Sequence, residues 1–437
     1  MKFKSKIFLL ALVICAYCCS SEQEDMVGTE KFRLWRACPI STIDDGKVHL
    51  KWGPVMERGP YCPTCPKDVD ADIIEIYFSE NEMSNFRKVI ELKNGGDYSY
   101  VVDRLQNSKS YFFYLVSKKK GFVSLISDTI MAVPNKRKGF EILQTSDPEH
   151  TPRLSSVSIA LQKNKIVYVD HYYTYSCPQW GTCMSTVIFM SNTDGSEREL
   201  ITNNTDGFPH SNGYNPRWSP TNDKIVFHFD GISNVGWIPA QIAMYDFDTE
   251  CITRLTEDNN YNYSPVFSKS GEYLLYQSSK NTLATYETDI WFMNLKTLES
   301  FQITDVSKTS LRTVERPNWI DNDRFLFHGI YHGEKYQLFE SSVSNKQITK
   351  VIESKWNDYT PSVSPDQTKI AFVSNRSRIP QIWIYHVVNK TYIQLTGYID
   401  TEESVNPNNH IEWLDNSTIM FSLGSSQGFQ LVKQKIE

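Results

Sequence analysis

The sequence predicts an all-β protein that has a small N-terminal sandwich followed by a large repeat domain. Two observations lead to this fold class. Short runs of alternating apolar and polar residues fill residues 31–135, and a motif recurs every fifty residues or so across residues 139–437. Aromatic residues make up 13% of the chain. Gly and Pro together total only 39 residues, 20 and 19, which excludes disordered and collagen-like chains.

The charge balance argues against a nucleic-acid partner. The 45 basic and 51 acidic residues give a net charge of −6, and no long basic run is present. Proteins that bind nucleic acids without sequence preference usually carry a basic patch or stripe. Removal of residues 1–18, which contain three lysines and no acidic residue, changes the net charge to −6 − 3 = −9.

Residues 1–18 read as a targeting segment. Three lysines precede the apolar run Ile7–Ile14, which is too short to span a bilayer. The following Cys15-Ala16-Tyr17-Cys18-Cys19-Ser20 resembles the lipobox of bacterial lipoproteins, with Cys19 as the lipidated residue and Cys18 as the alternative. This resemblance implies a lipid anchor in the outer membrane, facing either the cell surface or the periplasm, with residues 19–30 as an acidic tether. The alternative interpretation is cleavage by an ordinary signal peptidase without lipidation.

The remaining cysteines suit an oxidising compartment. Cys62 and Cys65 are spaced as a redox pair or half a zinc site, but they lie in a proline-rich loop with no second close pair. A loop disulfide, Cys62–Cys65 or one of the two with Cys38, is the prediction. We expect Cys177 and Cys183 to close a second loop and Cys251 to be buried.

Residues 31–135 predict a β-sandwich. Its strands are expected at Lys47–Trp52, Ile73–Phe78, Lys88–Leu92, Tyr98–Val102 and Ser110–Val116, with turn residues between them. Trp52 and the spacing from Leu105 to Tyr111 resemble a fibronectin type III domain with its tyrosine corner. Such domains serve as spacers or binding modules, and the residues suggest no chemistry here.

Residues 139–437 contain an internal repeat. Asn215-Pro216-Arg217-Trp218-Ser219-Pro220, followed by the strand Lys224–Phe227, returns in variant form along the chain. The anchors Trp218, Phe267, Trp319, Val363 and Trp413 lie 49, 52, 44 and 50 residues apart, and a looser first copy begins at Thr151-Pro152. Each copy continues with a third and a fourth strand.

Four short strands per copy at this period are typical of a β-propeller blade. The copies number six, but the last one stops at its third strand, Gln430–Lys433. Residues 140–145 read as the missing strand. We therefore predict a six-bladed β-propeller in which this N-terminal strand closes the last blade and leaves no open edge.

The copies resemble the propeller repeats of the TolB family, which share the pattern Pro-x-Trp/Phe-Ser-Pro-Asp before an Ile-Ala-Phe-like strand. This resemblance implies a scaffold that binds a protein partner at the outer membrane without catalysis, and no cofactor. A glycan is the other partner class to consider, because tyrosine suits a sugar face as well as a peptide.

The ligand-binding face is expected where the loops between blades open around the central channel. The position two before each loop proline, together with adjacent charged residues, gives the candidates His150, Tyr214, Tyr263, Glu315, Arg316, Tyr359, Asn409 and His410. The alternative is that these side chains pack on neighbouring loops around a water-filled channel.

Enzyme readings have less support. Gly424-Ser425-Ser426-Gln427-Gly428 matches a nucleophile elbow, but only nine residues follow it and none is histidine. His328 and His332, with His228 and His171 at similar points, partly resemble the metal-binding histidines of the oligogalacturonate lyases. That family gives the alternative function, a metal-dependent enzyme that cleaves oligosaccharides. Our prediction assigns no catalytic or metal-binding residue.

Overall fold

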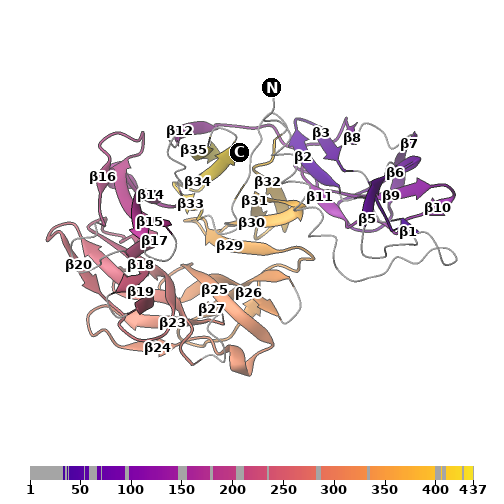
Figure 1. Ribbon diagram of the computed structural model, residues 1–437. Coiled ribbons are helices and arrows are strands. Elements are labelled where there is room, and N and C mark those ends of the chain that lie inside the picture. Colours follow the sequence, from indigo (N-terminus) through magenta and orange to yellow (C-terminus); the bar gives the residue numbers. More distant parts are fainter. Residues whose placement is uncertain are drawn as a thin grey trace. The chain divides into compact units, whose positions relative to one another are not determined.

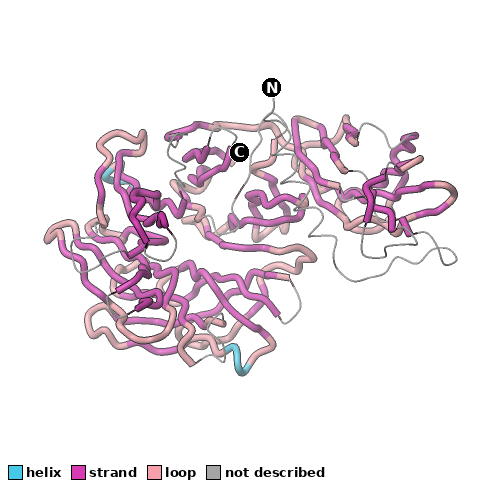
Figure 2. Tube along the Cα trace, in the orientation of Figure 1, coloured by secondary structure: helices cyan, strands magenta, loops and turns pink. Residues whose placement is uncertain are grey.

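Strands make up most of the computed structural model (Figures 1 and 2). It describes residues 33–34, 37, 39–53, 55–58, 66–69, 71–93, 98–145, 155–177, 181–202, 211–233, 236–281, 287–331, 335–398, 405, 410–425 and 428–436. Two short 3₁₀-helices, η1 (Leu161–Lys163) and η2 (Val306–Lys308), occur in these ranges. No helix in the described ranges is long and apolar enough to cross a membrane.

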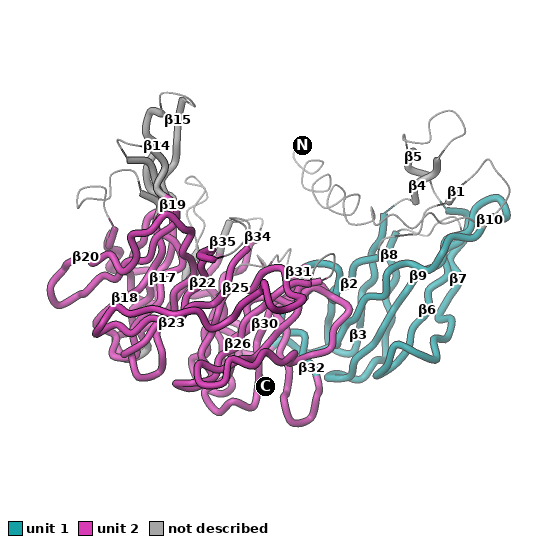
Figure 3. The backbone as a smooth tube through the Cα atoms, turned by 90° about the horizontal axis from the view of Figure 1, so that it is seen from below, with its two compact units in different colours: residues 1–137, 376–379, 392–400 teal, residues 138–375, 380–391, 401–437 magenta. Residues whose placement is uncertain are grey.

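The chain divides into two compact units (Figure 3). Unit 1 comprises residues 1–137, 376–379 and 392–400, and unit 2 comprises residues 138–375, 380–391 and 401–437. Unit 1 therefore includes two short segments from late in the chain in addition to the sandwich region.

Unit 1 contains a three-stranded and a five-stranded antiparallel sheet. The three-stranded sheet has the order β2 (Ile40–Asp44), β3 (Lys47–Lys51), β8 (Ser99–Val102). The larger sheet has the order β10 (Phe122–Val123), β9 (Tyr111–Lys119), β6 (Ile73–Glu80), β7 (Arg87–Lys93), with β11 (Ile130–Ala132) also paired to β9. A third small sheet joins β1 (Arg33–Leu34), β4 (Val55–Arg58) and β5 (Pro66–Val69). The five strands predicted for this region are all present.

The core of unit 1 follows from the alternation of its strands. In β3, Val48 and Leu50 are fully buried while the lysines at both ends are exposed, because successive side chains point to opposite faces. Trp52 is 6% exposed in the same core. Gly46 closes the tight turn between β2 and β3 with φ 65°, a conformation that side chains with a Cβ atom rarely adopt.

Four-stranded sheets make up unit 2, although residues 376–379 and 392–394 of one of these sheets are assigned to unit 1. Within the described residues six such sheets occur, and they account for every recurring motif of the sequence. Their strands are β13 (Ser155–Ala160), β14 (Lys165–Cys177), β15 (Gly181–Asn192), β16 (Glu199–Leu200); β17 (Ser211–Trp218), β18 (Lys224–Ser233), β19 (Gly236–Asp246), β20 (Cys251–Arg254); β21 (Asn262–Phe267), β22 (Tyr273–Ser278), β23 (Asp289–Asn294), β24 (Ser300–Gln302); β25 (Leu311–Trp319), β26 (Arg324–Tyr331), β27 (Tyr336–Ser342), β28 (Thr349–Lys350); β29 (Asp358–Val363), β30 (Lys369–Ser377), β31 (Ile379–His386), β32 (Thr391–Gln394); and β12 (Glu141–Thr145), β35 (Gly428–Lys435), β34 (Thr418–Ser425), β33 (Glu412–Trp413).

The sheets of unit 2 are joined through their first strands. β17 contacts β13 and β21, β25 contacts β21 and β29, and β33 contacts both β29 and β13. The middle strands are buried on both faces, as in β22 and β23, whereas the fourth strand β24 is exposed. This arrangement, with inner strands in mutual contact and polar outer strands, fits a β-propeller.

The recurring aromatic position packs between neighbouring sheets. The Trp319 indole N–H donates to the carbonyl of Val266, at 3.2 Å, and the Trp413 indole N–H donates to that of Ser362, at 3.0 Å. The corresponding Trp218 is 8% exposed, and its indole nitrogen has no hydrogen-bond partner among the described residues.

The predicted pairing of the N-terminal strand with the C-terminal sheet is confirmed. β12 runs antiparallel to β35, with Glu141 opposite Lys433 and Thr145 opposite Gln430. The Lys433 ammonium and the Glu141 carboxylate lie 2.7 Å apart. The pairing gives the last sheet its fourth strand and covers an edge that would otherwise be open.

Candidate functional site

The first strands of unit 2 share a backbone irregularity at the loop proline. In β17, β21, β25 and β29 the pairing with the second strand shifts by one residue, which is a β-bulge. The residue before the proline then has a positive φ: Asn215 (50°), Ser264 (49°), Arg316 (54°) and Thr360 (45°). Left-handed backbone is strained for residues with a Cβ atom and is disfavoured before proline. Such strain often marks functional positions.

Side chains from the preceding sheet hold three of these strained residues in place. The backbone N–H of Ser264 donates to Nδ1 of His228 at 3.4 Å, and that of Thr360 donates to Nδ1 of His328 at 3.2 Å. The N–H of Arg316 donates to Oε1 of Gln277 at 2.9 Å.

His228, Gln277 and His328 follow the aromatic residue of the second strand in three successive repeats, as Phe227-His228, Tyr276-Gln277 and Phe327-His328. Gln277 was not predicted as a functional residue, although its place in the repeat could have identified it.

The predicted tyrosines pack on these histidines. The Tyr214 ring stacks on His228, with centroids 5.3 Å apart, and Tyr263 meets the same ring edge-on at 5.3 Å. Tyr359 lies edge-on to His328 at 5.8 Å. Burial raises the pKa of Tyr263 to about 12. All three tyrosines are half-buried and lie on first strands, and none of them is among the residues that line the pocket described below.

The structure gives the buried histidines hydrogen-bonding roles. Burial, together with the charges of Arg316 and Arg217, lowers the pKa of His228 to about 3, so this ring is neutral. His328 is 1% exposed, and its Nε2 lies 3.6 Å from Oε2 of Glu315. Within the described residues no group of three or more His, Cys, Asp and Glu side chains is placed to hold a metal, and His332 lies outside them.

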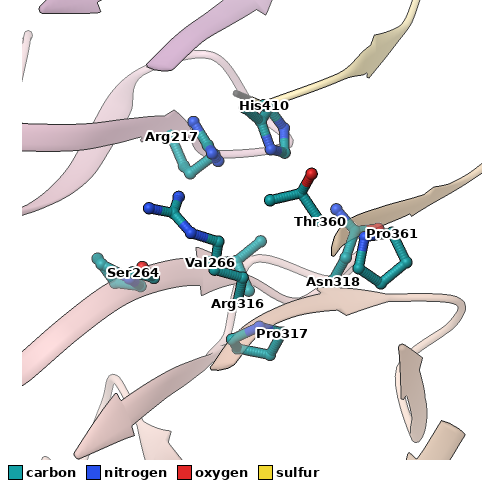
Figure 4. Close-up of a pocket in the computed structure, with 10 residues that line it drawn as sticks. Arg217, Ser264, Val266, Arg316, Pro317, Asn318, Thr360, Pro361 and His410 are labelled. Atoms are coloured by element: carbon teal, nitrogen blue, oxygen red, sulfur yellow. The ribbon is translucent and has the colours of Figure 1, made fainter. Parts of the chain in front are cut away.

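A pocket opens where the first strands meet. Its volume is about 340 Å³, including space open to solvent. Residues from β17, β21, β25 and β29, together with the residue two before β33, line it: Arg217, Ser264, Pro265, Val266, Arg316, Pro317, Asn318, Thr360, Pro361 and His410. Figure 4 shows the guanidinium groups of Arg217 and Arg316 and the imidazole of His410 pointing into the same space.

Charged side chains in and beside the pocket shift one another's pKa values. Burial lowers the pKa of Arg217 to about 10. The charge of Arg316 lowers this pKa further, and the charge of Glu412 acts in the opposite direction. Burial also lowers the pKa of His410, whose Nε2 lies 3.1 Å from the Glu412 carboxylate. Burial raises the pKa of Glu412, but His410 and Arg217 outweigh this effect and hold the pKa below its usual value. Two guanidinium groups thus line the pocket beside three prolines, and the Glu412 carboxylate, which is not part of the lining, lies next to the lining residue His410.

The candidate positions therefore divide into three groups. Arg316 and His410 line the pocket, whereas Tyr214, Tyr263, Glu315 and Tyr359 lie beside it on the first strands. His150, Asn409, Cys19, Cys62 and Cys65 lie outside the described residues, and of Cys177 and Cys183 the structure describes only the backbone. Arg217, which lines the pocket, was not predicted. The expectation of a buried Cys251 is wrong, since this cysteine is exposed at the start of the outer strand β20.

No family model matches the chain. In sequence it is 26% identical over 248 residues to the Tol-Pal system protein TolB of Francisella tularensis subsp. holarctica, covering 56% of this chain and 52% of the relative. The TolB protein of F. tularensis subsp. mediasiatica is 25% identical over the same length. The chain thus spans about half the length of the curated relatives it matches.

Solved structures with a similar course of the chain include TolB from Acinetobacter baumannii (15% identity, TM-score 0.42, covering 75% of this chain and 77% of that one). Oligogalacturonate lyase from Vibrio parahaemolyticus is another (11% identity, TM-score 0.47, covering 93% and 99%). On its sequence relationship to the TolB proteins and on its four-stranded sheets, this chain carries a TolB-like β-propeller.

Proposed function

We propose that the six four-stranded sheets of unit 2 are the blades of one closed propeller. Support comes from the contacts of the first strands, which lead from β13 through every sheet and return from β33 to β13. The lining of one pocket by residues of four of these sheets, together with His410 just before β33 of a fifth, also supports their convergence on a common axis. The span 139–437 is the proposed extent of this domain.

The sandwich region, residues 31–135, is proposed to be a fibronectin type III-like domain. Its two sheets pair the strands in the order expected for that fold, β2-β3-β8 and β10-β9-β6-β7. The Tyr111 hydroxyl accepts a hydrogen bond from the backbone N–H of Gln106 at 3.0 Å, which is the geometry of a tyrosine corner. Such a domain would act as a spacer or a second binding module.

The function that these features support best is a non-catalytic scaffold whose propeller binds a protein partner at the pocket face. The observation that carries this proposal is the pocket itself, where buried charges gather among strained backbone. Strain and buried charge both cost stability, and ligand-binding sites are where proteins tolerate such costs. The relationship to a Tol-Pal system protein favours a protein over a glycan as the partner.

We further propose that the chain is anchored to the outer membrane by a lipid on Cys19, followed by the acidic tether 19–30. The support is the sequence of the N-terminal segment, with its lysines, short apolar run and cysteines. Metabolic labelling with an alkyne fatty acid tests this anchor. Incorporation is expected in the natural chain and not in Cys19→Ser, while label that persists in Cys19→Ser and is lost in Cys18→Ser would move the lipid to Cys18.

Site-specific photo-crosslinking tests the scaffold proposal. A benzoylphenylalanine placed at Asn318, which lines the pocket, should give a discrete adduct with one protein in intact cells. The same group at Ser300, exposed on the outer strand β24, is the matched control and should not give this adduct. Equal adducts at both positions, or none at Asn318, would contradict a partner at the pocket face, and a carbohydrate adduct would favour the glycan class.

A further inference from the structure

The pocket of unit 2 brings together two arginines that form no salt bridge with any described carboxylate. Arg217 is only 9% exposed, and its Nη1 donates to the carbonyl oxygen of Pro216 at 2.8 Å. The Arg316 guanidinium donates from Nη1 to Oδ1 of Asn215 at 3.4 Å. Among the residues that the structure describes, no carboxylate oxygen lies within 4.0 Å of either guanidinium. Most of their N–H donors are therefore available to a ligand.

The two acids nearest to the arginines are engaged elsewhere. The Glu412 carboxylate lies 3.1 Å from Nε2 of His410, and the Glu315 carboxylate lies 3.6 Å from Nε2 of His328. Each of these carboxylates therefore orients a histidine rather than closing a salt bridge with a guanidinium. The pocket interior keeps its positive groups pointing inward (Figure 4).

Two like charges that share one pocket, with Arg217 buried and Arg316 half-buried, are unfavourable on their own. A buried charge that forms no direct salt bridge costs stability, and the two guanidiniums also repel each other, while the charges of Glu412 and Glu315 offset only part of this cost. Burial lowers the pKa of both arginines, in agreement with this cost. An anion between them would offset both the desolvation and the repulsion, and the planar guanidinium suits a bidentate contact with a carboxylate.

We propose that this pocket binds a carboxylate group of an acidic peptide segment, held between the guanidiniums of Arg217 and Arg316. The inference rests on the proposed function, a protein partner at the pocket face. The anionic groups of an unmodified polypeptide are carboxylates, which is why a carboxylate is favoured over a phosphate. The hydroxyl of Thr360 lines the same pocket as a further donor. Pro265, Pro317 and Pro361 give rigid apolar walls for the aliphatic part of an acidic side chain.

Calorimetric titration of the full mature chain tests this assignment with three probes: hexaglutamate, hexaglutamine and hexagalacturonate. Hexaglutamate should bind at least about tenfold more tightly than hexaglutamine. Arg217→Met and Arg316→Met should each weaken hexaglutamate binding by about tenfold or more, which corresponds to about 1.4 kcal/mol. Arg324→Met is the matched control, since this exposed arginine pairs with Asp321 away from the pocket and its loss should leave the affinity unchanged.

A thermal measurement separates loss of binding from loss of folding. Hexaglutamate should raise the melting temperature of the natural chain but not that of Arg217→Met, while both proteins unfold cooperatively. Equal binding of hexaglutamate and hexaglutamine, or unchanged affinity in both methionine variants, would overturn the assignment. Binding of hexagalacturonate alone would also overturn it and point to a uronate-containing glycan.

The crosslinking experiment at Asn318 distinguishes a failure of the carboxylate assignment from a failure of the scaffold proposal. A protein adduct at Asn318 that persists in the Arg217→Met background would refute the carboxylate contact and leave the scaffold proposal intact. Arginine-dependent binding of hexaglutamate without any cellular adduct would contradict the scaffold proposal while supporting the anion chemistry of the pocket.

Discussion

Asp289 offers a quantitative test of burial in the propeller. This residue at the start of β23 is 1% exposed. Its Oδ1 accepts hydrogen bonds from the Thr304 hydroxyl (2.7 Å) and the Val306 backbone N–H (3.0 Å), and its Oδ2 accepts one from Nε2 of Gln302 (3.0 Å). Burial nevertheless dominates and raises the pKa of Asp289 from 3.8 to about 6. The folded protein therefore binds a proton at Asp289 more tightly than the unfolded chain does.

The stability of the natural chain should fall as the pH rises through this window. Below the unfolded pKa of 3.8 the carboxyl is protonated in both states, and between 3.8 and about 6 only the folded state retains the proton. Each pH unit in that range then removes about 1.4 kcal/mol of stability. From about pH 4.5 the loss attributable to Asp289 reaches about 1.5 kcal/mol at pH 6 and about 2 kcal/mol at pH 7.5, above which it stays constant.

Asp289→Asn removes this titration, and urea unfolding followed by tryptophan fluorescence measures it. The difference in unfolding free energy, natural chain minus Asp289→Asn, should decrease by about 2 kcal/mol between about pH 4.5 and about pH 7.5. In Asp246→Asn the corresponding difference should stay flat over this range, because the hydrogen bond from Lys224 lowers the pKa of Asp246 below 3.8. A flat or increasing difference for Asp289→Asn would refute the reasoning.

Three further substitutions or deletions test the fold. Tyr111→Phe should lower the unfolding free energy by about 1–2 kcal/mol, because the hydrogen bond to the Gln106 N–H is lost. Tyr114→Phe should cost less, because the Tyr114 hydroxyl has no hydrogen-bond partner in the described part of the chain. Equal costs in urea unfolding would contradict the tyrosine corner. Trp319→Phe should cost about 1 kcal/mol more than Trp218→Phe, because the Trp319 indole donates to Val266 whereas the Trp218 indole has no hydrogen-bond partner among the described residues. A reversed order of the two costs in urea denaturation would contradict this difference. Deletion of Glu141–Thr145 should expose the edge of β35, lower the melting temperature and cause association that light scattering detects. A deletion variant that stays monomeric and keeps the natural melting temperature would contradict the role of β12 in closing the last sheet.

Much of the fold could be predicted because its signals are local and repeated. The alternation of Val48 and Leu50 with lysines is a property of a few neighbouring residues, and it predicts β3 wherever that strand packs. The repeat spacing likewise predicts each four-stranded sheet. Because the last copy lacks its fourth strand, even the long-range pairing of residues 141–145 with the C-terminus followed from the sequence.

The pocket could be predicted only in part. The sequence predicts that the positions two before each proline face the ligand, but a β-bulge adds one residue to β17, β21, β25 and β29, and residues at and after the bulge line the pocket instead. Arg316 and His410 were included because they neighbour the expected positions. Arg217 was not, because it follows the proline and nothing local distinguishes it from a surface arginine.

The sequence by itself determined the all-β class, the two-part organisation, the repeat and the pairing of the two ends of the propeller region. Each of these depends on periodicity or on a count, and both are complete in the linear chain. Only the tertiary structure decided that Arg217, Arg316 and His410 meet in one pocket and that the histidines of the second strands hold the backbone of the next sheet. The physical reason is distance along the chain. Neighbouring first strands lie about fifty residues apart in sequence, so their side chains come to line one pocket only when the chain is folded.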